Sequence, residues 1–429
     1  MPWDLTRQVV ALGLADVITD NTKDLMRSAR SLFDGVVTTS TLRLGVTGLS
    51  RSGKTVFITA LVNALTDANA VPAMTRITTQ PGFQAYLEPQ PDDDVPRFAY
   101  EDHRRALTSD NRTWPDSTRH ISQLRVTLEW DGETGTAGLF GLKRRLHIDI
   151  VDYPGEWLLD LALLDQSFSE WSAATLRTLK TRHDEKASAF LTFIYELHGS
   201  ASASNDEQTA ITGAKIFTAC LNAIRADTKT QAILGPGRFL WPGDLAGAPQ
   251  ITFFPSDAVT KNQETSSLTS LLEHRFEAYK ANVVKPFFTD HFSRIDRQIV
   301  LIDALSPLNR GALALRDLED ALQNVLTAFN PGTNSWLSFL TGRRIDRILF
   351  AATKADHVHS KEHSRLENIL EKVIARASRT AKHSGAATRT LAMASLRSTE
   401  DVTTKGDGEI YHCIRGIPAE GEIIDAKRY

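Results

Sequence analysis

The chain has 429 residues, of which 41% are hydrophobic and 24% charged, a composition typical of a globular protein with room for two or three domains. Its formal net charge of −3 excludes a global attraction to nucleic acid, so we expect no nucleic-acid partner. Two cysteines, Cys220 and Cys413, are too few for a disulfide framework and fit a reducing compartment. No uncharged apolar run reaches the roughly 18 residues of a spanning helix, and we expect no cleaved signal peptide.

The first expected element is a helix over residues 3–34, where apolar residues recur at helical spacing. Its polar side lacks the lysine and arginine richness of helices that lie on a membrane surface. We therefore favour packing of the apolar stripe on the core, with a peripheral membrane or partner helix as the alternative. Residues 1–40 form an N-terminal helical segment in the division that we predict.

A glycine-rich loop follows an expected strand over residues 42–47 and precedes an expected helix over residues 56–65. The loop is Gly-Leu-Ser-Arg-Ser-Gly-Lys-Thr from Gly48 to Thr55, the G-x-x-x-x-G-K-T pattern of a P-loop. Such a loop turns its N–H groups and the helix N-terminus toward a phosphate. Lys54 would neutralise the β- and γ-phosphates as a catalytic cation, and the Thr55 hydroxyl would bind Mg²⁺. The residues predicted to bind nucleotide here are Ser50, Arg51, Ser52, Gly53, Lys54, Thr55 and Val56.

Proline-rich loop chemistry, with at most short strands, is expected over residues 72–96. P-loop proteins that act as switches also use a mobile threonine that senses the γ-phosphate. The stretch just before an expected strand over residues 123–130 offers Thr118 as the first choice for this catalytic role and Thr113 as the second. Arg112 and Arg119 are candidates for an internal arginine finger.

An apolar strand over residues 147–151 runs into Asp152-Tyr153-Pro154-Gly155, a D-x-x-G motif. Asp152 would hold Mg²⁺, directly or through water, and the Gly155 N–H would contact the γ-phosphate. Glu156 follows, where Ras-like proteins often carry the glutamine that orients the attacking water. A carboxylate accepts from water but repels the γ-phosphate. Glu156 is our candidate for the catalytic residue at this position. Three explanations for a carboxylate here stay open: Glu156 has another task, intrinsic hydrolysis is slow, or another residue places the water.

The next long stretch, residues 157–296, exceeds what a minimal nucleotide-binding core needs before its next strand. Helical runs are expected at residues 168–179, 186–197, 207–226 and 265–288, with Gly-Pro-Gly at 235–237 and Trp-Pro-Gly at 241–243 as breaks. We predict a mainly helical insertion domain that acts as a lid on nucleotide exchange. The alternative is one enlarged domain whose helices pack along the sheet.

The chain then returns to strands at residues 297–304 and 347–352, with a helix over residues 313–329 between them. The second strand runs into Thr353-Lys354-Ala355-Asp356, similar to the N/T-K-x-D element of GTPases. There the aspartate accepts hydrogen bonds from N1–H and the 2-amino group of guanine, donors that adenine lacks. The Lys354 stem would lie over the base. A strand over residues 391–395 would offer the Ser395 N–H to the base carbonyl.

Three histidines, His357, His359 and His363, stand near the start of a helix expected over residues 361–377. Two of them form an H-x-x-x-H pair, but no third zinc ligand is identifiable. We therefore interpret them as a solvent-exposed helix start.

Over about residues 40–420 the chain resembles the YcjX-like family of bacterial P-loop GTPases. The resemblance is carried by four motifs: G-L-S-R-S-G-K-T, D-Y-P-G-E-W, R-Q-I-V-L-I-D-A-L and T-K-A-D. The resemblance implies a Ras-like GTPase core with a helical insertion, a cytoplasmic location, an association with stress responses, and a protein partner at the inner membrane.

We therefore predict an α/β fold, a doubly wound and mostly parallel sheet of P-loop GTPase type with an inserted, mainly helical domain. The core comprises residues 41–156 and 297–429, and the insertion residues 157–296. The expected function is binding of GTP and GDP with Mg²⁺ and slow hydrolysis of GTP, as a nucleotide-dependent switch with an effector protein. Two alternatives remain: an ATPase of related fold, and a nucleotide-bound scaffold with little turnover.

Overall fold

The computed structural model describes residues 39–49, 51–67, 78–115, 120–131, 143–199, 206–227, 234–256, 267–327, 345, 347–383, 386–406, 408–417, 423–424 and 427–428. The helix expected over residues 3–34 lies outside these residues.

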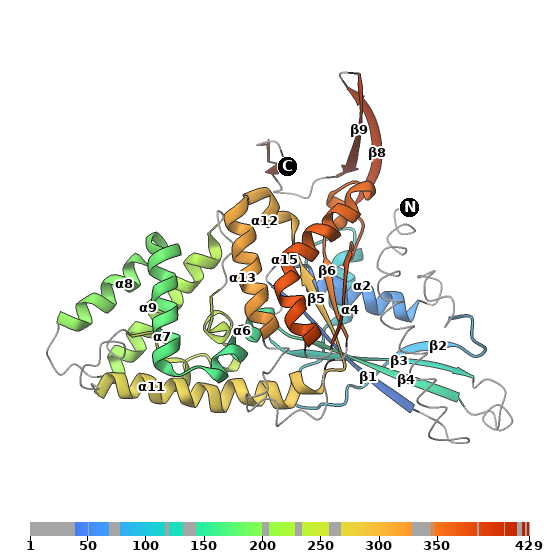
Figure 1. Ribbon diagram of the computed structural model, residues 1–429. Coiled ribbons are helices and arrows are strands. Elements are labelled where there is room, and N and C mark those ends of the chain that lie inside the picture. Colours follow the sequence, from blue (N-terminus) through green and yellow to red (C-terminus); the bar gives the residue numbers. More distant parts are fainter. Residues whose placement is uncertain are drawn as a thin grey trace.

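A seven-stranded sheet forms the centre of the molecule, in the order β2-β3-β4-β1-β5-β6-β7 (Figure 1). The five strands from β4 to β7 in this order run parallel, whereas β3 is antiparallel to both β2 and β4. This confirms the predicted mostly parallel α/β sheet. The strands are β1 (Thr39–Gly48), β2 (Gln84–Glu88), β3 (Ser122–Asp131), β4 (Lys143–Asp152), β5 (Arg297–Ile302), β6 (Arg347–Ala352) and β7 (Ala387–Ala392).

Helices cover both faces of this sheet. Every residue of β5 is buried, as in a central strand covered on both sides, and its side chains alternate between two hydrophobic clusters. Ile299 and Leu301 belong to the cluster that contains Phe57 and Leu61 of α2 (Lys54–Thr66). Val300 belongs to the other cluster, with residues of α13 (Ala312–Thr327) and α15 (His363–His383). Because the strands that precede the nucleotide motifs run parallel, their carboxyl ends lie together, and the motifs meet at one edge of the sheet.

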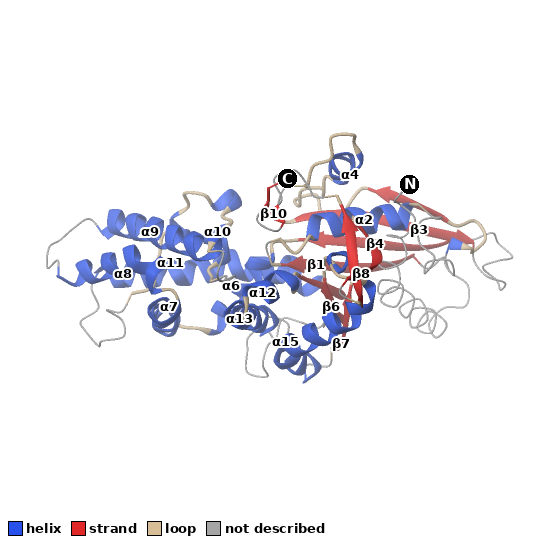
Figure 2. Cartoon of the chain, turned by 90° about the horizontal axis from the view of Figure 1, so that it is seen from above, coloured by secondary structure: helices blue, strands red, loops and turns tan. Residues whose placement is uncertain are grey.

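The described residues between β4 and β5 contain helices and loops but no strand. Figures 1 and 2 both place α7, α8, α9 and α11 at one end of the molecule, away from the sheet. The α-helices here are α6 (Leu158–Leu161), α7 (Phe168–Arg182), α8 (Asp184–Gly199), α9 (Asp206–Ala226), α10 (Gly237–Leu240) and α11 (Ser267–Tyr279). Short 3-10 turns span Gly155–Trp157, Ala162–Asp165, Gly243–Leu245, Pro249–Ile251 and Phe292–Arg294, and wider π-type turns span Lys280–Val284 and Phe287–His291.

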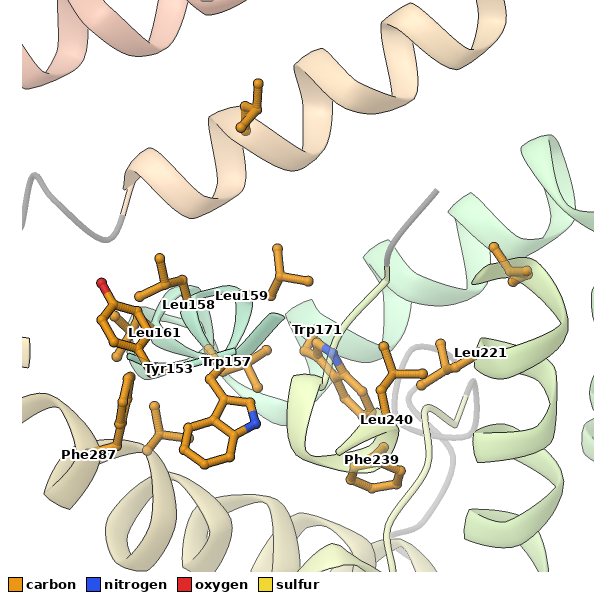
Figure 3. Close-up of a cluster of buried hydrophobic side chains, with 14 of the residues drawn as sticks. Tyr153, Trp157, Leu158, Leu159, Leu161, Trp171, Leu221, Phe239, Leu240 and Phe287 are labelled. Atoms are coloured by element: carbon orange, nitrogen blue, oxygen red, sulfur yellow. The ribbon is translucent and has the colours of Figure 1, made fainter. Parts of the chain in front are cut away.

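One hydrophobic cluster runs from the sheet into this helical region. It contains Val300 of the sheet, Tyr153 and Trp157 after β4, and Trp171 and Phe239 in the helices (Figure 3). Because packing is continuous across the boundary, the alternative of a single enlarged domain stays open. The insertion over residues 157–296 as a separate domain stays a prediction.

Several elements differ from the sequence-based expectations. The helix α4 (Tyr100–Thr108) follows the loop expected over residues 72–96 and was not predicted. The helix expected over residues 313–329 is α13, preceded by the short α12 (Leu305–Arg310). The strand expected over residues 391–395 ends earlier, at Ala392. A hairpin of β8 (Thr399–Gly406) and β9 (Glu409–Gly416) projects from the body (Figure 1), and a small pair, β10 (Ile423–Ile424) and β11 (Lys427–Arg428), follows. The hairpin was missed because polar and glycine residues dominate β8.

Candidate functional site

The glycine-rich loop turns sharply between β1 and α2. Gly53 adopts φ +80 at the start of α2, where a side chain would be strained. Gly48 is needed for a different reason, because a Cβ there would stand 2.7 Å from the Leu301 carbonyl oxygen. The Ser52 N–H closes the turn on the Leu49 carbonyl oxygen at 3.1 Å. The predicted strand, loop and helix are thus present, while Ser50 lies outside the described residues.

Strained backbone marks both predicted nucleotide motifs. Among the described residues, Arg51 (φ 67) and Lys354 (φ 60) are the two that have positive φ without being glycine. Left-handed backbone at such residues costs roughly 1–2 kcal/mol and is concentrated at binding and catalytic sites. Arg51 stands in the glycine-rich loop and Lys354 in T-K-A-D, far apart in sequence but at the same edge of the sheet.

Lys54 and Asp152 come together at this edge. The Lys54 Nζ lies 2.7 Å from Asp152 Oδ1 and donates a hydrogen bond of 2.7 Å to the Tyr153 carbonyl oxygen. The pairing of Val46 in β1 with Asp152 in β4 puts the two strand ends side by side. Both side chains are buried, 8% and 3% exposed, so each charge neutralises the other inside the protein.

The D-Y-P-G segment packs directly on the glycine-rich loop. A Cβ at Gly155 would stand 2.5 Å from the Gly48 carbonyl oxygen and 3.2 Å from the Leu49 nitrogen. Glycine is required here because D-Y-P-G and the glycine-rich loop approach each other closely. A movement of one of these segments would therefore displace the other. Glu156 follows in a 3-10 turn (Gly155–Trp157) and is buried rather than open to solvent. After this turn come the one-turn helix α6 and a second 3-10 turn, and most of their residues are buried.

Lys354 is held by a residue that the motifs did not single out for a role. Its Nζ lies 2.6 Å from Asp303 Oδ2, just beyond the end of β5. Asp303 Oδ1 also accepts a hydrogen bond of 3.1 Å from the Ser306 N–H. The available signal was an aspartate directly after a buried strand, inside R-Q-I-V-L-I-D-A-L.

The Asp356 carboxylate is buried and accepts hydrogen bonds from Ser398, which the sequence analysis did not single out. Its Oδ2 receives hydrogen bonds from the Ser398 N–H at 3.0 Å and the Ser398 hydroxyl at 2.9 Å. Ser395 stands in the bend after β7, close to the connection in which Ala355 N–H donates to the Met393 carbonyl oxygen. Ser398 carries no pattern that would have marked it in the sequence.

The remaining candidates come from the residues before β3 and from the histidines near the start of α15. Arg112 and Thr113 are exposed, and the Thr113 N–H donates to the Ala106 carbonyl oxygen in α4. Thr118 and Arg119 lie outside the described residues. The His363 Nε2 lies 2.8 Å from the Ala355 carbonyl oxygen, and the described residues contain no cluster of three or more histidine, cysteine or acidic side chains arranged to hold a metal.

The model of the YcjX-like family, DUF463, matches residues 42–427. The chain belongs to this family. A relative named Ras-like GTPase YcjX from Shewanella oneidensis is 36% identical over 406 residues, 89% of this chain and 82% of the relative. A second protein of the same name, from Escherichia coli, is 35% identical over 387 residues, 87% of this chain and 82% of the relative. These relatives support a GTPase-like function for this member of the YcjX-like family in general terms.

None of the helices described in this YcjX-like family member combines the length and apolar character that a membrane span requires. Cys220 and Cys413 are free thiols, in agreement with the expectation of no disulfide framework.

Beside the D-Y-P-G segment, a buried carboxyl joins three helices of the region between β4 and β5. Asp160 of α6 accepts from the Gly237 N–H at 2.6 Å, from the Arg238 N–H at 3.3 Å and from the Tyr279 hydroxyl at 2.7 Å. Burial raises the pKa of the Asp160 carboxyl from 3.8 to about 6, although these hydrogen bonds and the nearby Arg238 lower it in part. Asp160 thus connects α6, α10 and α11.

Replacing Asp160 by asparagine is expected to change the pH dependence of stability. The folded protein keeps the Asp160 proton up to about pH 6, whereas the unfolded chain loses it near pH 3.8. The folded state therefore binds more protons between these values, and its stability falls by about 3 kcal/mol as pH rises through this window. Free energies of unfolding from denaturant titrations should decline less steeply for Asp160→Asn than for the wild type between about pH 4 and about pH 7. Identical declines would contradict a buried carboxyl that stays protonated.

Proposed function

We propose that this protein binds GTP and GDP with Mg²⁺ and hydrolyses GTP slowly, as a nucleotide-dependent switch. The observation that supports this best is the meeting of two motifs at one sheet edge. The Lys54–Asp152 pair lies at the ends of β1 and β4, and the Asp356 carboxylate lies beyond β6 of the same parallel sheet. Ligands of open α/β sheets bind at the carboxyl ends of parallel strands.

The phosphate side of the site suits a nucleotide triphosphate. The loop N–H groups and the start of α2 face an anion, and Lys54 is the cation that would neutralise the β- and γ-phosphates. Lys54 would then exchange part of its contact with Asp152 for the phosphate. Gly155, packed against the loop, would bring its N–H to the γ-phosphate.

The donor set also suits Mg²⁺, because the Thr55 hydroxyl and the Asp152 carboxylate are hard oxygen ligands. Both residues are buried beside the loop. The ion would neutralise charge that develops on the phosphates during transfer. The Lys54 ammonium also provides a positive charge beside Asp152.

The base side suits guanine. Asp356 Oδ2 is held by Ser398, which orients the carboxylate for hydrogen bonds from N1–H and the 2-amino group of the base. Lys354, fixed by Asp303, would cover the face of the base with its stem. Adenine would leave the carboxylate unpaired, which is costly in a buried site.

Glu156 is the reason why we propose that GTP hydrolysis is slow. It stands where a water-orienting glutamine is common in Ras-like proteins, and it is buried. The family resemblance alone supports four further parts of the proposal: an effector protein, a cytoplasmic location, peripheral association with the inner membrane and a role in stress responses. Thr118 as the switch threonine rests on the sequence alone.

Calorimetric titration of nucleotide-free protein with GDP and with ADP, each with Mg²⁺, tests this proposal. We expect tight binding of GDP and weak binding of ADP, because only guanine donates two hydrogen bonds to Asp356. Equal affinities, or preference for ADP, would move the protein to the ATPase class. Tight GDP binding without GTP turnover, alone and with a membrane fraction or cell extract, would favour a nucleotide-bound scaffold.

A further inference from the structure

We propose that Arg238, which the helical region supplies, is a positioning residue for GTP hydrolysis. It holds Trp157, and with it the Gly155–Trp157 turn, in the arrangement that the reaction needs. The inference rests on the proposed function, because it concerns the same phosphate site. It adds a role for the residues between β4 and β5 beyond that of a lid over the nucleotide.

The first observation is the contact between Arg238 and Trp157. The guanidinium carbon of Arg238 lies 3.3 Å from the centroid of the Trp157 ring. The Trp157 indole is buried, and Phe287 meets it edge-on at 5.6 Å between centroids (Figure 3). A cation over the face of a tryptophan is a favourable contact, and more so away from water. The indole is therefore fixed from two sides, by a cation and by an aromatic ring.

The second observation is that the backbone that carries Arg238 is itself anchored. The Gly237 and Arg238 N–H groups donate to Asp160, which also accepts from Tyr279. A Cβ at Gly237 would stand 2.2 Å from the Glu156 carbonyl oxygen. The start of α10 therefore lies directly on the turn that follows D-Y-P-G, with no room for a side chain between them.

The third observation concerns the surroundings of the Arg238 guanidinium near Gly243. A Cβ at Gly243 would be 3.7 Å from Arg238 Nη1 and 3.2 Å from His120 Nδ1. His120 is the first described residue after residues 116–119, which include the predicted switch threonine Thr118. The Arg238 guanidinium thus lies over the turn that follows D-Y-P-G and near Gly243, which is also near His120.

These contacts indicate positioning rather than direct catalysis. The Arg238 guanidinium lies over an indole, while Lys54 is the cation beside Asp152. A hydrolytic site requires its groups to be held within about 0.5 Å of the productive geometry, and support from neighbouring side chains provides this. If Trp157 loses its cation, the Gly155 N–H and Glu156 lose their support. GDP binding depends on Lys54 and Asp356 and needs no contact from Gly155 to a γ-phosphate, so it should stay intact.

The test compares Arg238→Ala with Arg225→Ala in the full chain. Arg225 makes the same kind of contact in the same region, with its guanidinium carbon 4.4 Å from the Trp241 ring centroid, but it does not contact the D-Y-P-G turn. We expect Arg238→Ala to lower kcat for GTP by about 10-fold to 100-fold, because small misplacements of reacting groups have effects of this size. Kd for GDP should stay within about twofold of the wild type, because Lys54 and Asp356 are untouched and GDP has no γ-phosphate for Gly155 to contact. Arg225→Ala should retain wild-type kcat.

A third variant separates positioning from a general loss of structure. Arg238→Lys keeps a cation that can lie over the indole, so it should recover part of kcat. Thermal unfolding of all variants checks that they are folded. Equal kcat for Arg238→Ala and Arg225→Ala would overturn the positioning role alone. A parallel loss of GDP affinity in Arg238→Ala would also overturn it. Absence of GTP turnover in the wild type would overturn the proposed hydrolysis as well.

Discussion

Replacing Lys54 by alanine is expected to lower GTP turnover by roughly 10²–10³-fold, the usual effect of removing one preorganised donor from a charged transition state. The same change should lower the free energy of unfolding of the nucleotide-free protein by about 3–5 kcal/mol, because it leaves the Asp152 carboxylate buried without its cation. The distance of 2.7 Å between Lys54 Nζ and Asp152 Oδ1, and the burial of both side chains, support this second effect. Turnover assays and denaturant titrations measure the two effects separately.

A second substitution isolates the charge. Asp152→Asn in the Lys54→Ala background removes the buried ion, so part of the lost stability should return while turnover stays low. If Lys54→Ala unfolds at the same denaturant concentration as the wild type, the buried pair does not contribute to stability as argued here.

Asp356→Asn is expected to weaken GDP binding by roughly 10²–10³-fold, because two hydrogen bonds to a charged group are worth about 3–4 kcal/mol together. Xanthosine diphosphate should bind more tightly to the variant than to the wild type. The structure gives the reason for this exchange. The Ser398 N–H, which can only donate, faces Asp356 Oδ2 and would therefore hold the amide oxygen of asparagine. The amide NH₂ is then turned toward the base, where it suits the 2-oxo group of xanthine and repels the donors of guanine.

Calorimetry with both nucleotides checks this prediction. Asp401→Asn is a matched control, because the Asp401 carboxylate lies in the nearby hairpin and accepts from the Ser360 N–H at 3.2 Å. It should leave GDP affinity unchanged. If Asp356→Asn also binds GDP as the wild type does, the interpretation of T-K-A-D as a guanine-selecting motif is wrong.

Short-range patterns predicted much of the architecture. The loop from Gly48 to Thr55 lies between β1 and α2 as expected, and T-K-A-D follows β6. These predictions succeeded because strand and helix periodicity, glycine spacing and strand-end aspartates depend on residues close together in sequence. The hairpin of β8 and β9 was missed because the polar residues of β8 hide its strand character.

The sequence by itself determined the fold class and the order of the motifs along the chain. Only the tertiary structure decided which side chains support the motif residues. Ser398 donates to Asp356, Asp303 accepts from Lys354, and the Arg238 guanidinium lies over the Trp157 ring. Each of these pairs is separated by 42, 51 or 81 residues along the chain. Contacts over such separations depend on how helices and strands pack, and no local periodicity encodes them.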